Sequence, residues 1–239
     1  MEALERQRLA TAAVWRADVA RRRSGAWLWL DGLACHTTGL GVRPWNGAHL
    51  VAPDGMARLD EAAAWFDAWD VPWGVLVPAE MDVAPPGLTH LTDQPVMLRD
   101  LAGLPTAPDL DLRWDAGLDA AALQAEGFSE PRDRSEAFVL PKVGAPASAV
   151  VVGYDGSRPV ATATVFWVDG VAAVYGVATV PSHRRQGWGA AVTTAVLHEA
   201  ARLGCDLAFL NPSEPGRGVY ARLGFEDAPP WRVFVPPAG

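Results

Sequence analysis

Cysteine and lysine are scarce in this sequence of 239 residues, and the scarcity excludes several classes of protein. The two cysteines, Cys35 and Cys205, are too few for a disulfide framework or a clustered zinc site. Lys142 is the only lysine among the 20 basic residues, a bias that we attribute to codon usage. Since 28 residues are acidic and the net charge is −8, a broad basic face for DNA or RNA is not expected.

Long hydrophobic runs are absent as well, although 50% of the residues are hydrophobic. No uncharged apolar stretch reaches the roughly 18 residues that a transmembrane helix needs. The first residues include Glu2 and Glu5 and have no apolar stretch of the kind found in secretory signals. The histidines have no neighbours at metal-ligand spacing, so no metal site is predicted. We therefore expect a packed, cytoplasmic protein without a nucleic-acid or membrane partner.

Two successive sets of strand and helix patterns divide the chain. Between them, residues 103–109 contain Pro105 and Pro108 and are the best candidate for a linker. We therefore predict two α/β domains, residues 1–104 and 105–239. In the first domain, the patterns predict helices over 3–23 and 59–70 and strands over 27–30, 33–38, 49–52, 73–77 and 96–99.

The second domain has the more regular pattern. It is predicted to contain strands over 110–114, 149–154, 159–168, 171–180, 206–210 and 231–235 and helices over 118–126, 187–203 and 219–223. Asp169-Gly170 joins two β-branched runs and predicts a hairpin. The first domain has a similar but less regular order of elements, which indicates a tandem duplication.

The segment between the predicted strand 171–180 and the long helix carries the clearest chemical signal. Gly187 and Gly189 let the backbone turn tightly and approach a ligand, because no Cβ intervenes. The start of the helix offers unpaired N–H groups and the positive end of its dipole, and Arg184 and Arg185 add charge. This combination predicts a phosphate or pyrophosphate site. It is neither a Walker loop nor the three-glycine dinucleotide fingerprint.

Three features of this region together resemble the GCN5-related N-acetyltransferase (GNAT) family. Arg184-x-x-Gly187-x-Gly189 has the spacing of the family's acetyl-CoA motif, and the preceding segment, 177–181, is similar to its fourth strand. Further on, residues 220–225 are similar to its Tyr-x-x-Leu-Gly-Phe ending. The resemblance covers residues 110–239 and implies an α/β fold with a mixed, mostly antiparallel sheet flanked by helices.

The resemblance also implies roles for individual residues. The main chain of the fourth strand would pair with the pantetheine arm of acetyl-CoA, and the following loop would wrap the pyrophosphate. Ser213 stands where many members have an Asn, and Tyr220 is the catalytic residue that would reach the thioester sulfur and assist departure of the thiolate. The implied cofactor-binding residues are Val177, Ala178, Thr179, Arg184, Arg185, Gln186, Gly187, Trp188, Gly189, Ala190 and Ser213.

The first domain is similar to a degenerate copy of the same fold, as in tandem acetyltransferases. At the equivalent place, residues 53–59 lack the Arg-x-x-Gly-x-Gly motif, so we expect no second cofactor site. The seven tryptophans of this domain either line a substrate cleft or pack in the core and the domain interface.

The resemblance implies that acetyl-CoA is the co-substrate, without a metal, and that its acetyl group passes to a small-molecule or peptide amine by direct attack in a ternary complex. One departure from the family bears on this expectation. Ala173 occupies the place of a carboxylate that many members use as general base. The base is therefore unassigned, which favours the alternative of a non-catalytic acyl-CoA-binding or regulatory protein. The acceptor, the acyl-chain length and the oligomeric state stay open.

Overall fold

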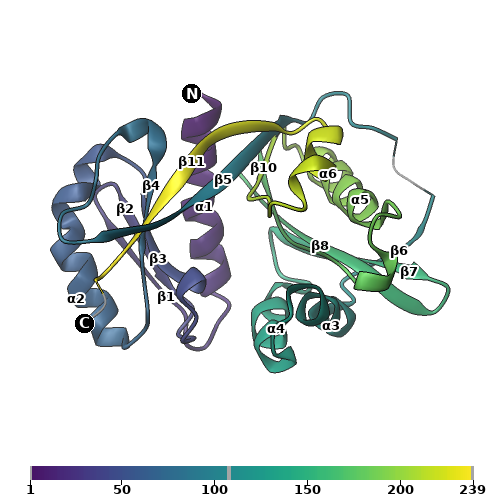
Figure 1. Cartoon of the computed structure of the whole chain (residues 1–239), viewed down its shortest axis with the longest axis horizontal. Coiled ribbons are helices and arrows are strands. Elements are labelled where there is room, and N and C mark those ends of the chain that lie inside the picture. Colours follow the sequence, from purple (N-terminus) through teal and green to yellow (C-terminus); the bar gives the residue numbers. More distant parts are fainter. Residues whose placement is uncertain (1, 107–108, 238–239) are drawn as a thin grey trace. The chain divides into compact units, whose positions relative to one another are not determined.

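The computed structural model describes residues 2–106 and 109–237 and divides into two compact units (Figure 1). The N-terminal unit consists of Met1–Val96 and Asp227–Gly239, and the C-terminal unit is Met97–Glu226. These bounds differ from the expected division after residue 104, because the last strand of the chain pairs within the N-terminal unit. Of the expected linker, Pro108 lies outside the described residues.

The N-terminal unit is a sheet with a helix on either face. Its elements are α1 (Ala3–Val19), β1 (Ala26–Leu30), β2 (Leu33–Thr37), β3 (Asn46–Leu50), α2 (Leu59–Trp69), β4 (Val75–Pro78), the first part of β5 (Thr89–Asp100) and most of β11 (Glu226–Val235). The strand order is β1-β2-β3-β4-β11-β5. Phe66 of α2 packs on Leu33 and Val75, while α1 covers the other face of β2 and β3. The first helix ends at Val19, earlier than its pattern predicts.

The C-terminal unit follows the predicted order, with one helix that the sequence patterns did not indicate. Its elements are β6 (Asp111–Trp114), α3 (Gly117–Phe128), α4 (Arg132–Val139), β7 (Ser148–Asp155), β8 (Arg158–Val168), β9 (Val171–Thr179), α5 (Trp188–Arg202), β10 (Leu207–Leu210) and α6 (Arg217–Arg222). The strand order is β5-β10-β9-β8-β7-β6, and only the β9–β10 pair is parallel among the pairings described in this unit. The prediction of a mixed, mostly antiparallel sheet is confirmed.

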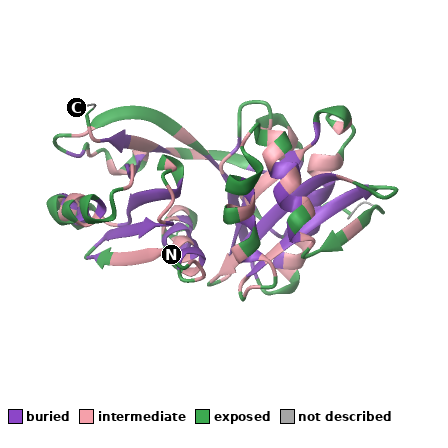
Figure 2. Ribbon diagram, turned by 90° about the horizontal axis from the view of Figure 1, so that it is seen from below, coloured by how far each residue is buried: buried purple, intermediate pink, exposed green. Residues whose placement is uncertain are grey.

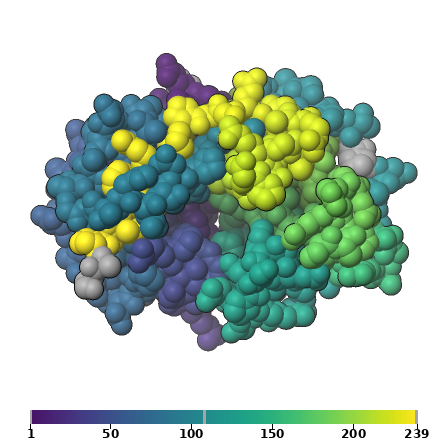
Figure 3. Space-filling model, in the orientation of Figure 1, coloured from purple at the N-terminus to yellow at the C-terminus, as the bar shows by residue number. Residues whose placement is uncertain are grey.

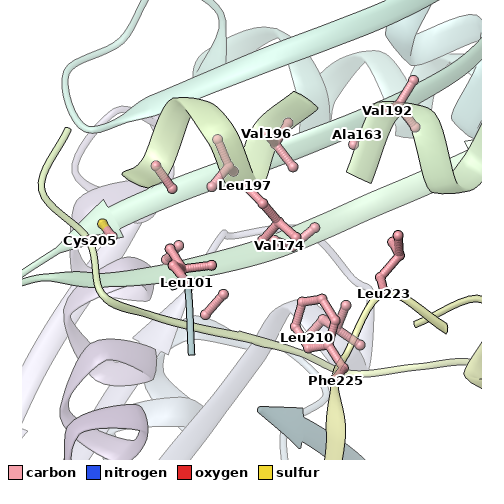
Figure 4. Close-up of a cluster of buried hydrophobic side chains, with 14 of the residues drawn as sticks. Leu101, Ala163, Val174, Val192, Val196, Leu197, Cys205, Leu210, Leu223 and Phe225 are labelled. Atoms are coloured by element: carbon pink, nitrogen blue, oxygen red, sulfur yellow. The ribbon is translucent and has the colours of Figure 1, made fainter. Parts of the chain in front are cut away.

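Helices cover both faces of the C-terminal sheet (Figure 1). On one face, Val192 and Val196 of α5 share one buried apolar cluster with Val174 and Leu210 of the sheet, and Figure 4 shows Val192 beside Ala163. On the other face, α3 and α4 bury a second apolar cluster against β7 and β8. Figure 2 shows the consequence, since the strands of this sheet are mostly buried and the outer sides of the helices are exposed.

Lys142, the only lysine, follows α4 and is 2% exposed. Its ammonium group donates to the carbonyl oxygen of Phe138 and lies over the ring of that residue. The side chain is therefore part of the interior of the C-terminal unit rather than of its surface. Both cysteines are also buried, and neither forms a disulfide.

Candidate functional site

The parallel strands β9 and β10 of the C-terminal unit separate partway along their length. Their pairing runs from Val171 with Leu207 to Val174 with Leu210, where β10 ends. Strand β9 continues to Thr179, and its register against β8 shifts at Gly176, which has a φ of 60°. This bulge and the end of β10 leave residues 176–178 without a strand partner on the β10 side within the described chain.

The loop after β9 presents a row of free backbone amides. A short 3-10 helix, Pro181–His183, leads into a turn in which Arg185 and Gly187 have φ values of 61° and 88°. Within the described parts of the chain, the amides of residues 185–190 donate to no protein acceptor. The first amide of α5 that is bonded belongs to Ala191, which donates to the carbonyl oxygen of Gly187 at 2.9 Å. Such a row at a helix N-terminus favours an anion.

Space and charge in this loop also fit an anion. No heavy atom lies within 4 Å of the position that a Cβ on Gly187 would occupy, and a Cβ on Gly189 would meet only Thr179 Oγ1, at 3.4 Å. The first turn of α5 contains no acidic residue, so nothing there opposes a negative ligand. The loop residues 185–187 are exposed on the surface drawn in Figure 3. The space and the charge in this loop are therefore compatible with the pyrophosphate site that the sequence predicts.

Other predicted loop residues hold the loop on the protein. The Arg184 guanidinium donates to the carbonyl oxygens of Thr179 and Gly127, each at 3.2 Å, so it caps the C-terminal end of α3 as well as the end of β9. The Gln186 side chain donates to the carbonyl oxygen of Ser182 at 3.0 Å. The Trp188 ring packs beside Gly153 of β7, where an added Cβ would lie 3.2 Å from it. These contacts fix the path of the free amides.

Tyr220 lies on α6, on the face of the sheet that α5 covers. Its ring packs edge-on against Phe225, with centroids 6.1 Å apart, and its hydroxyl has no hydrogen-bond partner within the described chain. Burial raises the pKa of Tyr220 to about 12. Ser213 is exposed, and its carbonyl oxygen accepts from the amides of Gly216 and Arg217, which starts α6.

The opposite face of the same region carries Ala173 where many members of the family have a carboxylate. Ala173 is fully buried and pairs with Phe166 and Phe209 on its two neighbouring strands. Gln124 of α3, which the sequence did not single out, is 4% exposed and lies so close to the bulge that a Cβ on Gly176 would collide with its carboxamide. The only signal for it was a polar residue on the inner side of an apolar helix.

Residues 116–225 match the model of the acetyltransferase (GNAT) family, so this domain belongs to that family. No curated protein matches the chain. Among solved structures, a GCN5-related N-acetyltransferase from Kribbella flavida is similar over 97% of this chain and 95% of its own, with 25% identity and a TM-score of 0.73. A GNAT-family protein from Novosphingobium aromaticivorans is similar over 89% of this chain and 92% of its own, with 19% identity and a TM-score of 0.63.

A tandem GNAT protein from the clavulanic acid biosynthesis pathway is similar over 91% of this chain and 86% of its own, with 16% identity and a TM-score of 0.59. Because these structures span nearly the whole chain, the likeness includes the N-terminal unit. The predictions of the GNAT fold and of a second, GNAT-like lobe are confirmed. In the described residues, no cluster of three or more potential metal ligands occurs, and no helix is long and apolar enough to span a membrane.

Proposed function

We propose that the C-terminal unit transfers the acetyl group of acetyl-CoA to an amine. The observation that carries the proposal is the row of free amides at residues 185–190, at the start of α5 and beside the open end of β9. These amides would bind the pyrophosphate, and the open backbone of residues 177–179 would pair with the pantetheine arm. Arg184 supports the site by holding the loop to α3 and β9.

The reaction is a direct displacement in a ternary complex. The amine nitrogen attacks the thioester carbonyl carbon, the new C–N bond forms and the C–S bond breaks. Coenzyme A leaves as a thiolate that takes up one proton, and the nitrogen loses one. The net products are an N-acetyl compound and the free thiol, so no redox partner is needed.

Tyr220 is the residue to which the family resemblance gives the role of assisting the leaving thiolate, but it is a poor acid. A thiol has a pKa of about 8.5, so proton transfer from a phenol of pKa about 12 is unfavourable by roughly three orders of magnitude. We therefore assign Tyr220 a hydrogen bond to the sulfur rather than full proton transfer. The proton reaches the thiolate from water.

The buried Ala173 favours a second candidate function, an acyl-CoA-binding protein without transfer activity. An assay of thiol release with and without amines separates the two. A transferase releases coenzyme A in proportion to added amine and yields a product heavier by one acetyl group in mass spectrometry. Tight binding of acetyl-CoA with no amine-dependent release supports the binding protein instead.

A further inference from the structure

The outer edge of β1 has no strand beside it, whereas the matching edge in the C-terminal unit is covered. In the C-terminal unit, the hairpin β7–β8 is flanked by β6, which pairs with β7 in antiparallel orientation. The N-terminal unit has the matching hairpin, β1–β2, but within the described residues no strand pairs with the outer side of β1. The two GNAT-like units therefore differ by one antiparallel strand at this edge.

The backbone groups of two tryptophans point outward from β1. The two-residue turn after Leu30 makes that residue and Leu33 a hydrogen-bonded pair, and bonded pairs then alternate along the hairpin. The amide and carbonyl groups of Leu28 therefore point to β2, and those of Trp27 and Trp29 point away from it. Within the described chain, these outward groups have no hydrogen-bond partner.

No residue of β1 protects this edge against pairing with another strand. Residues 26–30 read Ala-Trp-Leu-Trp-Leu, without a charge or a proline, and the hairpin has no bulge. Trp29 is 48% exposed. By contrast, β6, the edge strand of the C-terminal unit, carries the exposed ion pair of Asp111 and Arg113, 2.7 Å apart. Charges on an edge strand discourage pairing with another chain, and an apolar edge without them favours it.

We propose that β1 pairs with β1 of a second copy of this chain, in antiparallel orientation about a twofold axis at Leu28. In this register, Leu28 lies opposite Leu28 of the second copy, and Trp27 of each copy lies opposite Trp29 of the other. Every outward amide and carbonyl group of the two tryptophans then has a partner, whereas a shifted register leaves some of them unpaired. The tryptophan side chains lie on the face of the sheet that α1 covers, so pairing also brings them into cross-strand contact.

The charges at the two ends of β1 favour a second copy in this orientation. Arg23 precedes the strand and is exposed, and Asp31 follows it with a side chain that is 82% exposed. Antiparallel pairing brings the end with Asp31 of each copy to the end with Arg23 of the other, so opposite charges attract at both ends. A parallel arrangement would bring like charges together. The strand is therefore complementary to itself in backbone pattern and in charge.

Cysteine crosslinking tests the register. Leu28→Cys should form a disulfide-linked dimer under mild oxidation, because residues on the axis would have Cα atoms about 4.5 Å apart. Trp29→Cys is the matched control and should not link to its own copy, since those two Cα atoms would be more than about 7 Å apart. A mixture of Trp27→Cys and Trp29→Cys chains should crosslink. The native Cys35 and Cys205 are buried, so the wild-type chain should stay unlinked.

Sedimentation velocity on the full chain measures the association itself. The wild-type protein should show a concentration-dependent equilibrium between monomer and dimer. Trp29→Lys should weaken dimerisation by at least about tenfold, because it places a charge in the apolar strand pair. Trp114→Lys, at a tryptophan of β6 that is 43% exposed, is the matched control and should leave dimerisation unchanged. Arg23→Glu should weaken it by about threefold at low salt, and less at high salt.

The outcomes that overturn the proposal are distinct from those that bear on acetyl transfer. A wild-type protein that stays monomeric up to on the order of 100 μM overturns it. So does a dimer that folded Trp29→Lys leaves intact, or one that folded Leu28→Cys does not link. If these variants do not fold, hydrogen exchange of the wild-type protein decides. The amides of Trp27 and Trp29 should gain protection as the concentration increases, and unchanged protection overturns the proposal.

Discussion

Both units have a loop at the same point of their sheets, but the backbone amides of the two loops differ in their hydrogen bonding. In each, a strand pairs in parallel with the next one for a few residues and then leads through a 3-10 helix into a longer helix. After β9, the loop amides are free. After β3, Gly55 packs so tightly that an added Cβ would lie 2.5 Å from the carbonyl carbon of Gly32. The amide of Gly55 donates to Ala52, and those of Val51 and Ala52 donate to Gly32.

Charge reinforces the difference between the two loops. The first turn of α2 contains Asp60 and Glu61, whereas the first turn of α5 contains no acid. Carboxylates at a helix N-terminus occupy the favourable end of the dipole and repel an anionic ligand. The shared fold alone therefore does not leave a helix N-terminus open to an anion, which also requires a loop whose amides have no partner in the protein.

The largest expected effect concerns a cut between residues 104 and 105. The fragment 105–239 lacks Met97–Asp100, which pair with β10, and retains residues of β11 whose partner is β4. We expect the fragment alone to show no cooperative thermal unfolding and no binding of coenzyme A. Coexpression with fragment 1–104 should restore both. A fragment 105–239 that melts cooperatively and binds coenzyme A would contradict this.

Glycine substitutions test the two loops directly. Gly187→Val should weaken coenzyme A binding by at least about 100-fold in calorimetry, because the side chain enters the space that the anion needs. Gly204→Val is the control for backbone strain, since Gly204 ends the same helix with a φ of 90° and open space around it. It should bind coenzyme A normally.

The matching substitution in the other loop, Gly55→Val, should leave coenzyme A binding at one molecule per chain and destabilise the fold by about 1–3 kcal/mol or more. Thermal unfolding measures the loss. A second binding event in the wild-type titration, or normal binding by Gly187→Val, would remove the distinction between the loops.

Acid should affect the N-terminal unit first. Trp15 stacks on His36 at 4.1 Å, and His36 stacks on His49 at 5.1 Å. Burial lowers the pKa of His49 from 6.5 to about 3, and burial and the neighbouring His49 lower that of His36 well below 6.5. Below pH 6.5 these histidines are protonated in the unfolded chain but stay neutral in the folded one. Each histidine therefore lowers the free energy of unfolding by roughly 1 kcal/mol per pH unit, down to its pKa in the folded state.

Hydrogen exchange at pH 7 and pH 5 checks this expectation, because the C-terminal unit has no buried histidine in its described residues. The amides of β2 and β3 should lose protection at pH 5 before those of β8 and β9. His49→Phe should reduce the pH dependence, since the ring remains and the titrating group is gone. Equal loss of protection in both units would argue against a special role for the histidine pair.

Tyr220→Phe should lower kcat by about tenfold, the low end of the range for acid catalysis, and change KM for acetyl-CoA little. The reason is that the phenol with its raised pKa stabilises the thiolate by a hydrogen bond alone. Steady-state kinetics at saturating acceptor measures the effect. An unchanged kcat would reduce Tyr220 to a residue that packs on Phe225.

Arg184→Ala should have the smallest effect, a loss of about tenfold or less in coenzyme A affinity. Its guanidinium is bonded to Thr179 and Gly127, so the variant loses support for the loop rather than a phosphate contact. Salt-dependent titrations distinguish the two, since a phosphate contact would make the loss shrink as salt increases.

The sequence could predict the elements that depend on local signals. The hairpin at Asp169-Gly170 and the long helix α5 lie where the turn residues and the apolar periodicity put them. The helix α4 was missed because Arg132–Val139 is mostly polar and its inner side consists of Ser135 and Val139. The pairing of β11 with β4 was also missed, because the residues of a strand do not determine which distant strand it pairs with.

The same limit applies to the site. The glycines and the free helix start could be predicted, because backbone geometry and a helix dipole follow from local sequence. That Arg184 would cap α3 could not, since Gly127 is far from it along the chain. The place of Gln124 could not be predicted for a similar reason, because it depends on a bulge at Gly176 in a strand that packs against α3.

The burial of Lys142 has a consequence for transfer assays that use acetyl-CoA as the donor. Amines on protein surfaces are acetylated slowly by acetyl-CoA without any enzyme, and lysine side chains are the usual targets. Here every other basic side chain is an arginine, which does not attack thioesters, and the single lysine amine is enclosed next to Phe138. The chain therefore has no exposed lysine side chain that could compete with an added acceptor. In an assay with labelled acetyl-CoA, label on the protein itself should not come from surface lysines.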